Sequence, residues 1–222
     1  MRIVSAEVRE SHPRLIIAFI LDESGSMKDV LGQTIEAYNS YVEGQQQTEL
    51  ARREGQVFFV LTKFDSDVKV VHGAKEIHTI QKLSENVYNP TNGWTALNDA
   101  IGVTIESVDS AISDWEEKPN VLCVILTDGK ENRSQRFSES LIARMIAERK
   151  KQGWTFVFLG SDPYTRIASR SYGISEGNTL HYKAKDVRGA MRRLSLSTDT
   201  YCCALDSDDH RDGCSVENFF EE

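Results

Sequence analysis

The chain has 222 residues, of which 40% are hydrophobic, and this is enough for the core of one large domain but too short for two full domains. Its 26 Lys and Arg against 34 Asp and Glu give a formal net charge of -8, which disfavours the neutralisation of nucleic-acid phosphates as a main task. The longest apolar run, residues 15–21, is far below the roughly 20 residues that span a bilayer, and only four Cys are present. We therefore expect a soluble, cytoplasmic protein with no nucleic-acid or membrane partner.

Apolar runs and helical patterns alternate along the chain. In the first half of the chain we expect a strand at 14–21, a helix at 27–42, strands at 57–64 and 68–72, and a helix at 97–115. In the second half we expect a strand at 121–126, a helix at 137–146, a strand at 155–159, a helix at 163–172, a strand at 180–182 and a helix near 186–196. Nearly continuous apolar runs are typical of parallel strands that are covered on both faces. The turn Asp65-Ser66-Asp67 predicts a hairpin into an antiparallel edge strand. The fold class is therefore α/β, with an open, mostly parallel sheet and helices on both faces.

Oxygen-bearing side chains follow two of these strands and precede one helix. Asp22, Ser24 and Ser26 come after the first predicted strand, Asp128 follows the fourth, and Thr95 precedes the second long helix. Taken singly, each is an ordinary residue for a helix cap or a turn. Together they place oxygen donors at the carboxyl edge of the sheet, where open α/β sheets bind ligands. With no Cys or His among them, these donors predict a divalent cation, Mg²⁺ first and Mn²⁺ or Ca²⁺ as alternatives.

The pattern resembles a von Willebrand factor A domain with a complete metal-ion-dependent adhesion site (MIDAS). The family pattern is Asp-x-Ser-x-Ser, then a distant Thr, then a distant Asp followed by Gly, and it matches all five donors over residues 14–199. The resemblance implies a Rossmann-like sheet of strand order 3-2-1-4-5-6, in which the first and fourth strands are neighbours. It also implies that Ser24, Ser26 and Thr95 coordinate the ion directly, that Asp22 and Asp128 hold it largely through waters, and that an Asp or Glu of a partner protein fills the remaining position.

Within the family, the stretch at 153–160 is similar to compact stand-alone members from bacteria and phages. Intracellular members often serve as adaptor or assembly factors for larger machines, sometimes alongside AAA+ ATPases. The resemblance therefore implies a metal-dependent protein-protein interaction module rather than an enzyme.

The main alternative is a metal-dependent phosphatase or hydrolase of the haloacid-dehalogenase type, which also places an Asp at the end of the first strand. Its mechanism needs a second Asp two residues later as acid and base, and that position is Ser24. The glycine-rich phosphate-binding motifs G-x-G-x-x-G and G-x-x-x-x-G-K-[ST] are absent from the sequence.

Residues around the predicted ion are expected to form a rim that contacts the partner: Glu23, Tyr88, Asn89, Trp94, Lys130 and Arg133. Trp94 stands where a small residue is common in the family. Because aromatic anchors dominate interfaces, Trp94 is expected to lead specificity, although it could instead pack over the loop at 87–92.

Composition divides the chain into a lead-in at 1–13, the domain at 14–199 and a tail at 200–222. The tail holds seven acidic residues and one Arg, so most of the net charge lies there. A solvated tail is the simplest expectation, but a carboxylate such as Glu217, Glu221 or Glu222 could reach the ion and compete with partners.

Overall fold

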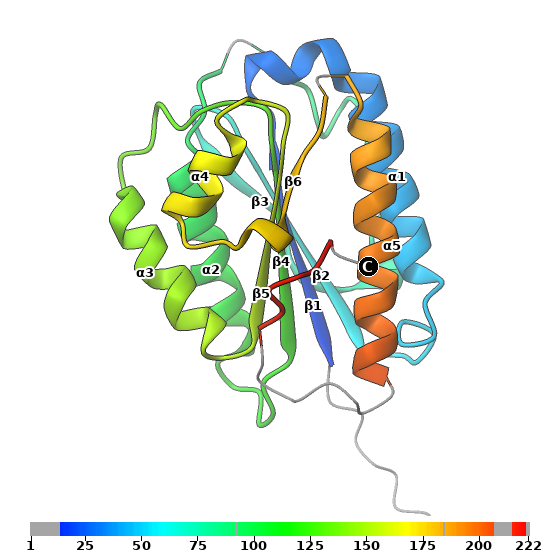
Figure 1. Cartoon of the computed structure of the whole chain (residues 1–222). Coiled ribbons are helices and arrows are strands. Elements are labelled where there is room, and N and C mark those ends of the chain that lie inside the picture. The colour runs from blue at the N-terminus through cyan, green and yellow to red at the C-terminus, as the bar shows by residue number, and fades with distance from the viewer. Residues whose placement is uncertain (1–13, 92, 184, 207–214, 221–222) are drawn as a thin grey trace, which may run out of the picture.

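The computed structural model describes residues 14–91, 93–183, 185–206 and 215–220 (Figure 1). Its strands are β1 (Leu15–Asp22), β2 (Val57–Phe64), β3 (Val68–Glu76), β4 (Asn120–Thr127), β5 (Trp154–Gly160) and β6 (Thr179–His181). Its helices are α1 (Leu31–Gln46), α2 (Leu97–Ile112), α3 (Glu139–Lys150), α4 (Thr165–Ser171) and α5 (Val187–Asp206). Three short 3₁₀ helices, η1 (Gly25–Val30), η2 (Ile77–Thr79) and η3 (Glu176–Asn178), lie between them. The expected lead-in at 1–13 lies outside the described residues.

The strands form one sheet in the order β3-β2-β1-β4-β5-β6, and only the β2–β3 pair is antiparallel. The predicted strand order and the antiparallel edge strand are therefore confirmed. β1 lies in the middle and pairs with β2 on one side and β4 on the other, with Leu21 level with Leu126. The first residues after β1 and β4 therefore emerge side by side at the carboxyl edge, at the top of Figure 1.

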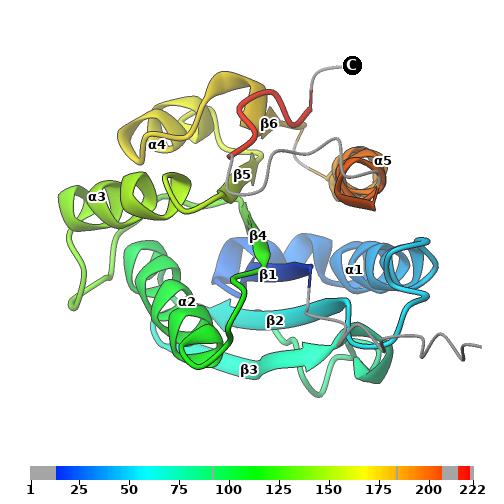
Figure 2. The same ribbon diagram turned by 90° about the horizontal axis from the view of Figure 1, so that it is seen from below.

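Helices cover both faces of the sheet, as expected. α1 and α5 lie on one face, and α2, α3 and α4 lie on the other (Figure 2). Alternate residues of β1 serve the two faces, because successive side chains of a strand point to opposite sides. Phe19 and Leu21 join the core under α1 and α5, whereas Ile16 and Ile20 join the core under α2 and α3.

The last helix is longer than predicted. α5 was expected to end near residue 196 but runs to Asp206, across the boundary expected at 199. Tyr201, Cys202 and Leu205 continue its buried stripe beyond Leu194, because they return to the same face at helical spacing. In the described ranges, no helix combines the length and the apolar character needed to cross a bilayer.

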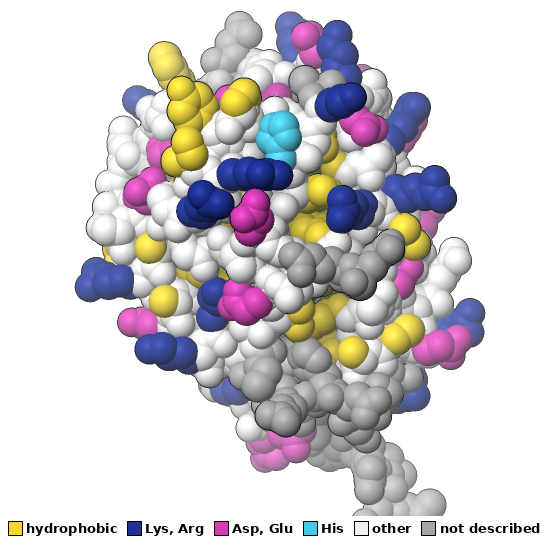
Figure 3. All heavy atoms as spheres, viewed as in Figure 1, with side chains coloured by type: hydrophobic (Ala, Val, Ile, Leu, Met, Phe, Trp, Pro, Cys, Tyr) yellow, Lys and Arg dark blue, Asp and Glu magenta, His cyan; other side chains and the backbone are white. Residues whose placement is uncertain are grey.

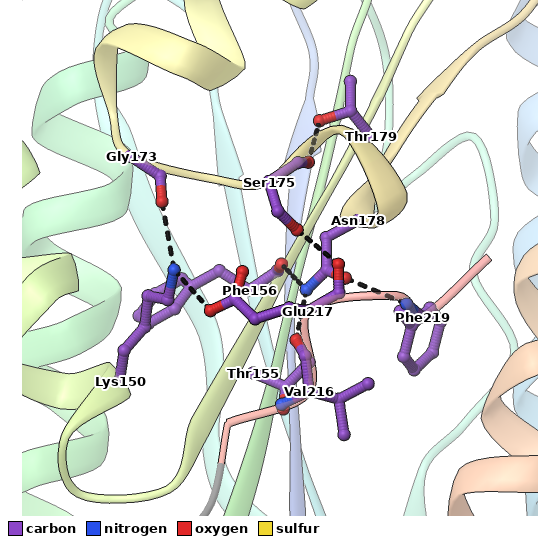
Figure 4. A network of polar contacts seen from close by, with 10 residues as sticks. All are labelled: Lys150, Thr155, Phe156, Gly173, Ser175, Asn178, Thr179, Val216, Glu217 and Phe219. Atoms are coloured by element: carbon purple, nitrogen blue, oxygen red, sulfur yellow. Dashed lines mark hydrogen bonds and ion pairs between the residues drawn. The ribbon is translucent and has the colours of Figure 1, made fainter. Parts of the chain in front are cut away.

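Part of the acidic tail packs against the domain. In the C-terminal segment (residues 215–220), Phe219 and Phe220 are buried, and the Phe219 N–H donates to Asn178 Oδ1 at 2.9 Å. Asn178 also donates to the carbonyls of Phe156 and Val216 (Figure 4). The segment thereby covers the part of the β5 edge that the three-residue β6 leaves unpaired.

The position of Glu217 corrects one expectation about the tail. Its carboxylate pairs with Lys150 at 2.7 Å, at the end of α3, and its neighbour Val216 contacts Thr155 near the amino end of β5. The carboxyl edge lies at the opposite end of that strand, so Glu217 does not reach the predicted ion. Glu221 and Glu222 lie outside the described residues.

Candidate metal centre

Four of the five predicted ligands form one hydrogen-bonded cluster at the carboxyl edge. The Ser24 N–H donates to Asp22 Oδ1 at 2.7 Å, and the Ser24 and Ser26 hydroxyl oxygens lie 3.1 Å apart. The Ser26 hydroxyl donates to Asp128 Oδ1 at 2.5 Å, which joins the loop after β1 to the loop after β4. Residues 102 positions apart in the sequence thus meet because β1 and β4 are neighbours in the sheet.

The fifth predicted ligand, Thr95, is buried beside the same loop. A Cβ built on Gly129 would lie 2.9 Å from Thr95 Oγ1, closer than real Cβ contacts allow. Only glycine lets the Asp128–Gly129 turn approach the threonine this closely. The structure therefore brings Thr95 together with the other four residues.

The two carboxylates of the cluster are held in an environment that disfavours their charge. Burial raises the pKa of Asp22 from 3.8 to about 6, although hydrogen bonds from Ser24 and Thr127 oppose the shift. Burial also raises the pKa of Asp128, and the carboxylate of Asp162 adds to that shift. A cation between Asp22 and Asp128 would relieve both effects.

The donor set fits a hard divalent cation. It consists of two carboxylates and three hydroxyls, and oxygen donors of this kind suit Mg²⁺, Mn²⁺ or Ca²⁺. Among the described residues, no group of three or more His, Cys, Asp or Glu side chains is placed to hold a metal. A cation at this edge would therefore depend on the hydroxyls of Ser24, Ser26 and Thr95 as well as on the carboxylates.

Two of the six expected rim residues have buried or largely buried side chains and do not point to solvent. Tyr88 is fully buried, and its hydroxyl donates to the backbone carbonyl of Asp22 at 2.7 Å. This hydrogen bond ties the segment around Tyr88 to the end of β1. The Glu23 side chain is only 12% exposed and pairs with Lys63 at 2.7 Å. Its carboxylate also accepts the Asn89 N–H at 2.6 Å. Both residues were expected at the rim because they are close to the site in the sequence-based prediction, but they anchor the loop at 87–89.

The other four expected rim residues are exposed. Asn89, Lys130 and Arg133 present their side chains to solvent, and Trp94 is 62% exposed rather than packed over its neighbouring loop. The ammonium group of Lys130 lies 2.9 Å from the centre of the Tyr164 ring, a cation–π contact.

A hollow of about 270 Å³ opens beside Gly129 and Lys130. Apolar side chains such as Phe158 and Ile167 line it together with the charged side chains of Glu131 and Asp162. A hollow of mixed character therefore borders the cluster on the side of α4.

Two residues of the site were missed by sequence reasoning. The Thr127 hydroxyl donates to Asp22 Oδ2 at 2.5 Å, and Asn132 makes two hydrogen bonds with the backbone of Thr95. Thr127 could have been found from the predicted pairing of the first and fourth strands, since it directly precedes Asp128. Asn132 gave no signal beyond being a common turn residue in a polar loop.

Comparison with solved structures supports the fold. Proximal thread matrix protein 1 of the mussel byssus, in a form with a zinc-occupied MIDAS motif, has a TM-score of 0.62 at 16% identity over 85% of this chain and 48% of its own. The von Willebrand factor type A protein of Catenulispora acidiphila has a TM-score of 0.57 at 15% identity over 85% of this chain and 43% of its own. The corresponding domain of the type V pili tip protein Mfa5 from Porphyromonas gingivalis has a TM-score of 0.62 at 10% identity, over 86% of this chain and 97% of its own.

The present chain spans about half the length of the mussel protein, and identities this low establish the fold alone. No curated protein matches the sequence. The family model of the von Willebrand factor type A domain matches residues 17–209, so the chain belongs to the von Willebrand factor type A domain family.

Proposed function

We propose that this chain is a metal-dependent protein-binding module. In this proposal Asp22, Ser24, Ser26, Thr95 and Asp128 hold a divalent cation, Mg²⁺ first, and the cation accepts an Asp or Glu carboxylate of a partner protein. One observation carries the proposal: these donors, from three separate segments, converge on one cluster. The charge of Asp128 raises the pKa of Asp22, and the charge of Asp162 raises the pKa of Asp128. A bound cation would offset this repulsion between carboxylates.

The bound cation would supply a positive charge with room for an external ligand. The family resemblance assigns Ser24, Ser26 and Thr95 as direct ligands and assigns Asp22 and Asp128 a role through waters. With neutral hydroxyls as its direct protein ligands, the cation keeps most of its charge for the partner's carboxylate. Exclusion of water on binding strengthens this attraction, because the local dielectric constant falls.

The surface around the cluster supports recognition of a protein. Four large hydrophobic residues are prominently exposed among the described residues: Trp94, Tyr164, Ile167 and Leu196. Trp94 directly precedes Thr95, and Tyr164 and Ile167 follow the carboxyl end of β5, so three of the four lie at the same edge as the cluster. Exposed apolar residues that gather in this way are typical of an interaction site.

Basic side chains also lie on the approach to this edge. Figure 3 shows Lys and Arg side chains over α4, β6 and the start of α5. Arg170, Lys183 and Arg188 are exposed residues of these parts of the chain. Arg170 pairs with Glu176 and Arg188 pairs with Glu36, so the basic side chains alternate with carboxylates and offer a partner polar contacts of both signs.

The family resemblance favours an adaptor or assembly factor within a larger machine, in some members alongside an AAA+ ATPase. A hydrolase of the haloacid-dehalogenase type is disfavoured, because Ser24 occupies the position of the required acid and a hydroxyl is a poor proton carrier.

Binding of Mn²⁺, measured by electron paramagnetic resonance, tests the first half of the proposal. Wild-type protein is expected to bind one ion that Mg²⁺ displaces, and Thr95→Ala and Asp128→Ala are expected to bind it at least tenfold more weakly. The control variant Lys151→Ala changes an exposed residue at the end of α3 and should bind as the wild type does. Wild-type protein that binds no ion would refute the proposal.

A partner tests the second half. Proteins captured in Mg²⁺ but not in EDTA are candidates, and a candidate is accepted when replacing one of its acidic residues by the amide abolishes binding. Trp94→Ala should weaken that complex without changing Mn²⁺ affinity, because its side chain lies at the surface and not in the cluster. A complex that keeps its affinity in excess EDTA would show that recognition uses another face.

A further inference from the structure

The start of α2 is capped by a distant loop rather than by its own residues. The N-cap residue, Ala96, has no side-chain oxygen, and the Asn98 and Asp99 N–H groups would otherwise lack partners within the helix. Glu131 Oε2 accepts the Asn98 N–H at 2.7 Å, and Ser134 Oγ accepts the Asp99 N–H at 2.9 Å. A threonine at the start of a helix often provides this cap. Here the loop after β4 provides it, and the Thr95 hydroxyl is not used as the cap.

The same loop holds the backbone of Thr95 from both sides. Asn132 Oδ1 accepts the Thr95 N–H at 2.8 Å, and the Asn132 N–H donates to the Thr95 carbonyl at 3.1 Å. The backbone N–H and the backbone carbonyl of Thr95 are therefore both hydrogen-bonded to one residue, Asn132. Asn132 lies four positions after Asp128, so it connects the segments that carry two of the proposed ligands.

The loop that contains Asn132 is itself held by carboxylates. Glu131 Oε1 accepts the Arg133 and Ser134 N–H groups, both at 2.8 Å. Asp99 accepts three consecutive N–H groups of residues 135–137, each at 2.9 Å. These bonds fix the loop to the first turn of α2, so a displacement of Asn132 would be transmitted to Thr95.

We propose that Asn132 is a positioning residue for the cation, which sets the place of the Thr95 hydroxyl relative to Asp128. The inference rests on the proposed function and goes beyond it, since Asn132 is not one of the ligands. If Asn132 already holds Thr95 in place, the Thr95 hydroxyl loses less conformational freedom when the ion binds. Residues that orient metal ligands typically change metal affinity by about 10–100-fold when they are replaced.

Three variants separate positioning from stability. Asn132→Ala removes the bond to the Thr95 N–H, and Asn132→Asp keeps a side-chain acceptor at the same place. Ser134→Ala is the matched control, because it removes one cap of α2 from the same loop but has no bond to Thr95. The measurements are the Mn²⁺ dissociation constant and the melting temperature in EDTA.

Asn132→Ala is expected to weaken Mn²⁺ binding by about tenfold, whereas Asn132→Asp and Ser134→Ala stay within about threefold of the wild type. Asn132→Ala and Ser134→Ala should lower the melting temperature in EDTA to similar extents. The inference is wrong if Asn132→Ala binds Mn²⁺ as the wild type does, or if Ser134→Ala loses as much affinity as Asn132→Ala. Failure of the wild type itself to bind Mn²⁺ would instead refute the proposed function.

Discussion

The burial of Asp22 leads to a counterintuitive prediction: without a cation, Asp22→Asn should stabilise the domain at neutral pH. Asp22 is fully buried at the end of the central strand, and its pKa of about 6 means that folding favours the protonated carboxyl. An asparagine has the same shape and no charge. Its Oδ1 can accept the Ser24 N–H, and its Nδ2 can donate to Thr127 Oγ1, which would then turn its own hydrogen toward the Gly129 carbonyl 3.3 Å away.

The size of the effect follows from the pKa difference between the unfolded and folded chain. A rise of the Asp22 pKa from 3.8 to about 6 means that the ionised carboxylate destabilises the folded protein by about 3 kcal/mol at pH 7.5. The hydrogen bonds from Ser24 and Thr127 to the ionised carboxylate are already contained in this pKa, so the expected gain in stability is about 3 kcal/mol. For a chain of this length that gain raises the melting temperature by about 6–12 °C.

The effect of Asp22 on stability depends on pH. Because the folded pKa is raised, the stability that this carboxyl contributes is present below pH 3.8 and is lost as the pH rises through about 6. The difference in free energy of unfolding between Asp22→Asn and the wild type should therefore have its full value at pH 7.5 and fall to about a third of that value at pH 4.5. Added Mg²⁺ should reverse the order, since an ion at 1,000 times its Kd stabilises the wild type by about 4.1 kcal/mol.

Differential scanning calorimetry in EDTA at the two pH values, followed by addition of Mg²⁺, measures all three effects. The reasoning fails if Asp22→Asn is less stable than the wild type in EDTA at pH 7.5, or if the gap between them is the same at both pH values. A less stable variant would show that the hydrogen bonds to the ionised carboxylate outweigh its burial, and an equal gap would show that the two effects cancel.

Three further predictions concern other parts of the structure. Phe219→Ala should cost about 3 kcal/mol in urea unfolding, because the ring is buried, whereas Leu196→Ala, at an exposed position on α5, should cost little; equal costs would mean that the C-terminal segment does not hold the domain. Lys63→Met should cost about 2 kcal/mol and expose the loop at 87–89 to proteases, because Glu23 loses its partner in a largely buried pair, and the added change Glu23→Gln should recover most of the stability. Gly129→Ala should weaken Mn²⁺ binding by about tenfold, because its Cβ would meet the neighbouring threonine hydroxyl, and unchanged affinity would show that this contact is not used.

The sheet and the cluster could be predicted because they depend on local patterns. β1 and β4 are apolar over nearly their whole length; Asp22 directly follows the last apolar residue of its run, and Asp128 follows one residue later, after Thr127. Parallel strands must end at the same edge, so residues after neighbouring strands meet once the strand order is known. That order came from the family resemblance rather than from periodicity.

The supporting residues could not be predicted, because they depend on how loops fold back. Glu23 and Tyr88 have the polar character of rim residues, but Lys63 and the carbonyl of Asp22 draw them inward. Asn132 looks like any turn residue until its loop is placed over Thr95. Sequence proximity to a site thus identifies neighbours, but it does not tell which side chains turn toward solvent.

The end of the chain was misjudged for a related reason. Acidic composition in residues 200–222 indicated a solvated tail, and the average obscured Phe219 and Phe220, which are buried against the domain. α5 was also expected to end too early, although its buried face continues through Tyr201.

The position of β1 has a consequence for motion within the site. All eight of its residues are buried and it is paired on both sides, so its amides should be among the last to exchange with deuterium. Asp22 therefore stands on the least mobile part of the molecule, whereas Ser26 is carried by η1, and Thr95 and Asp128 are carried by loops. Capture and release of an ion would then be a movement of η1 and these loops around a fixed carboxylate, and exchange rates in those segments, rather than in the sheet, should report whether the ion is present.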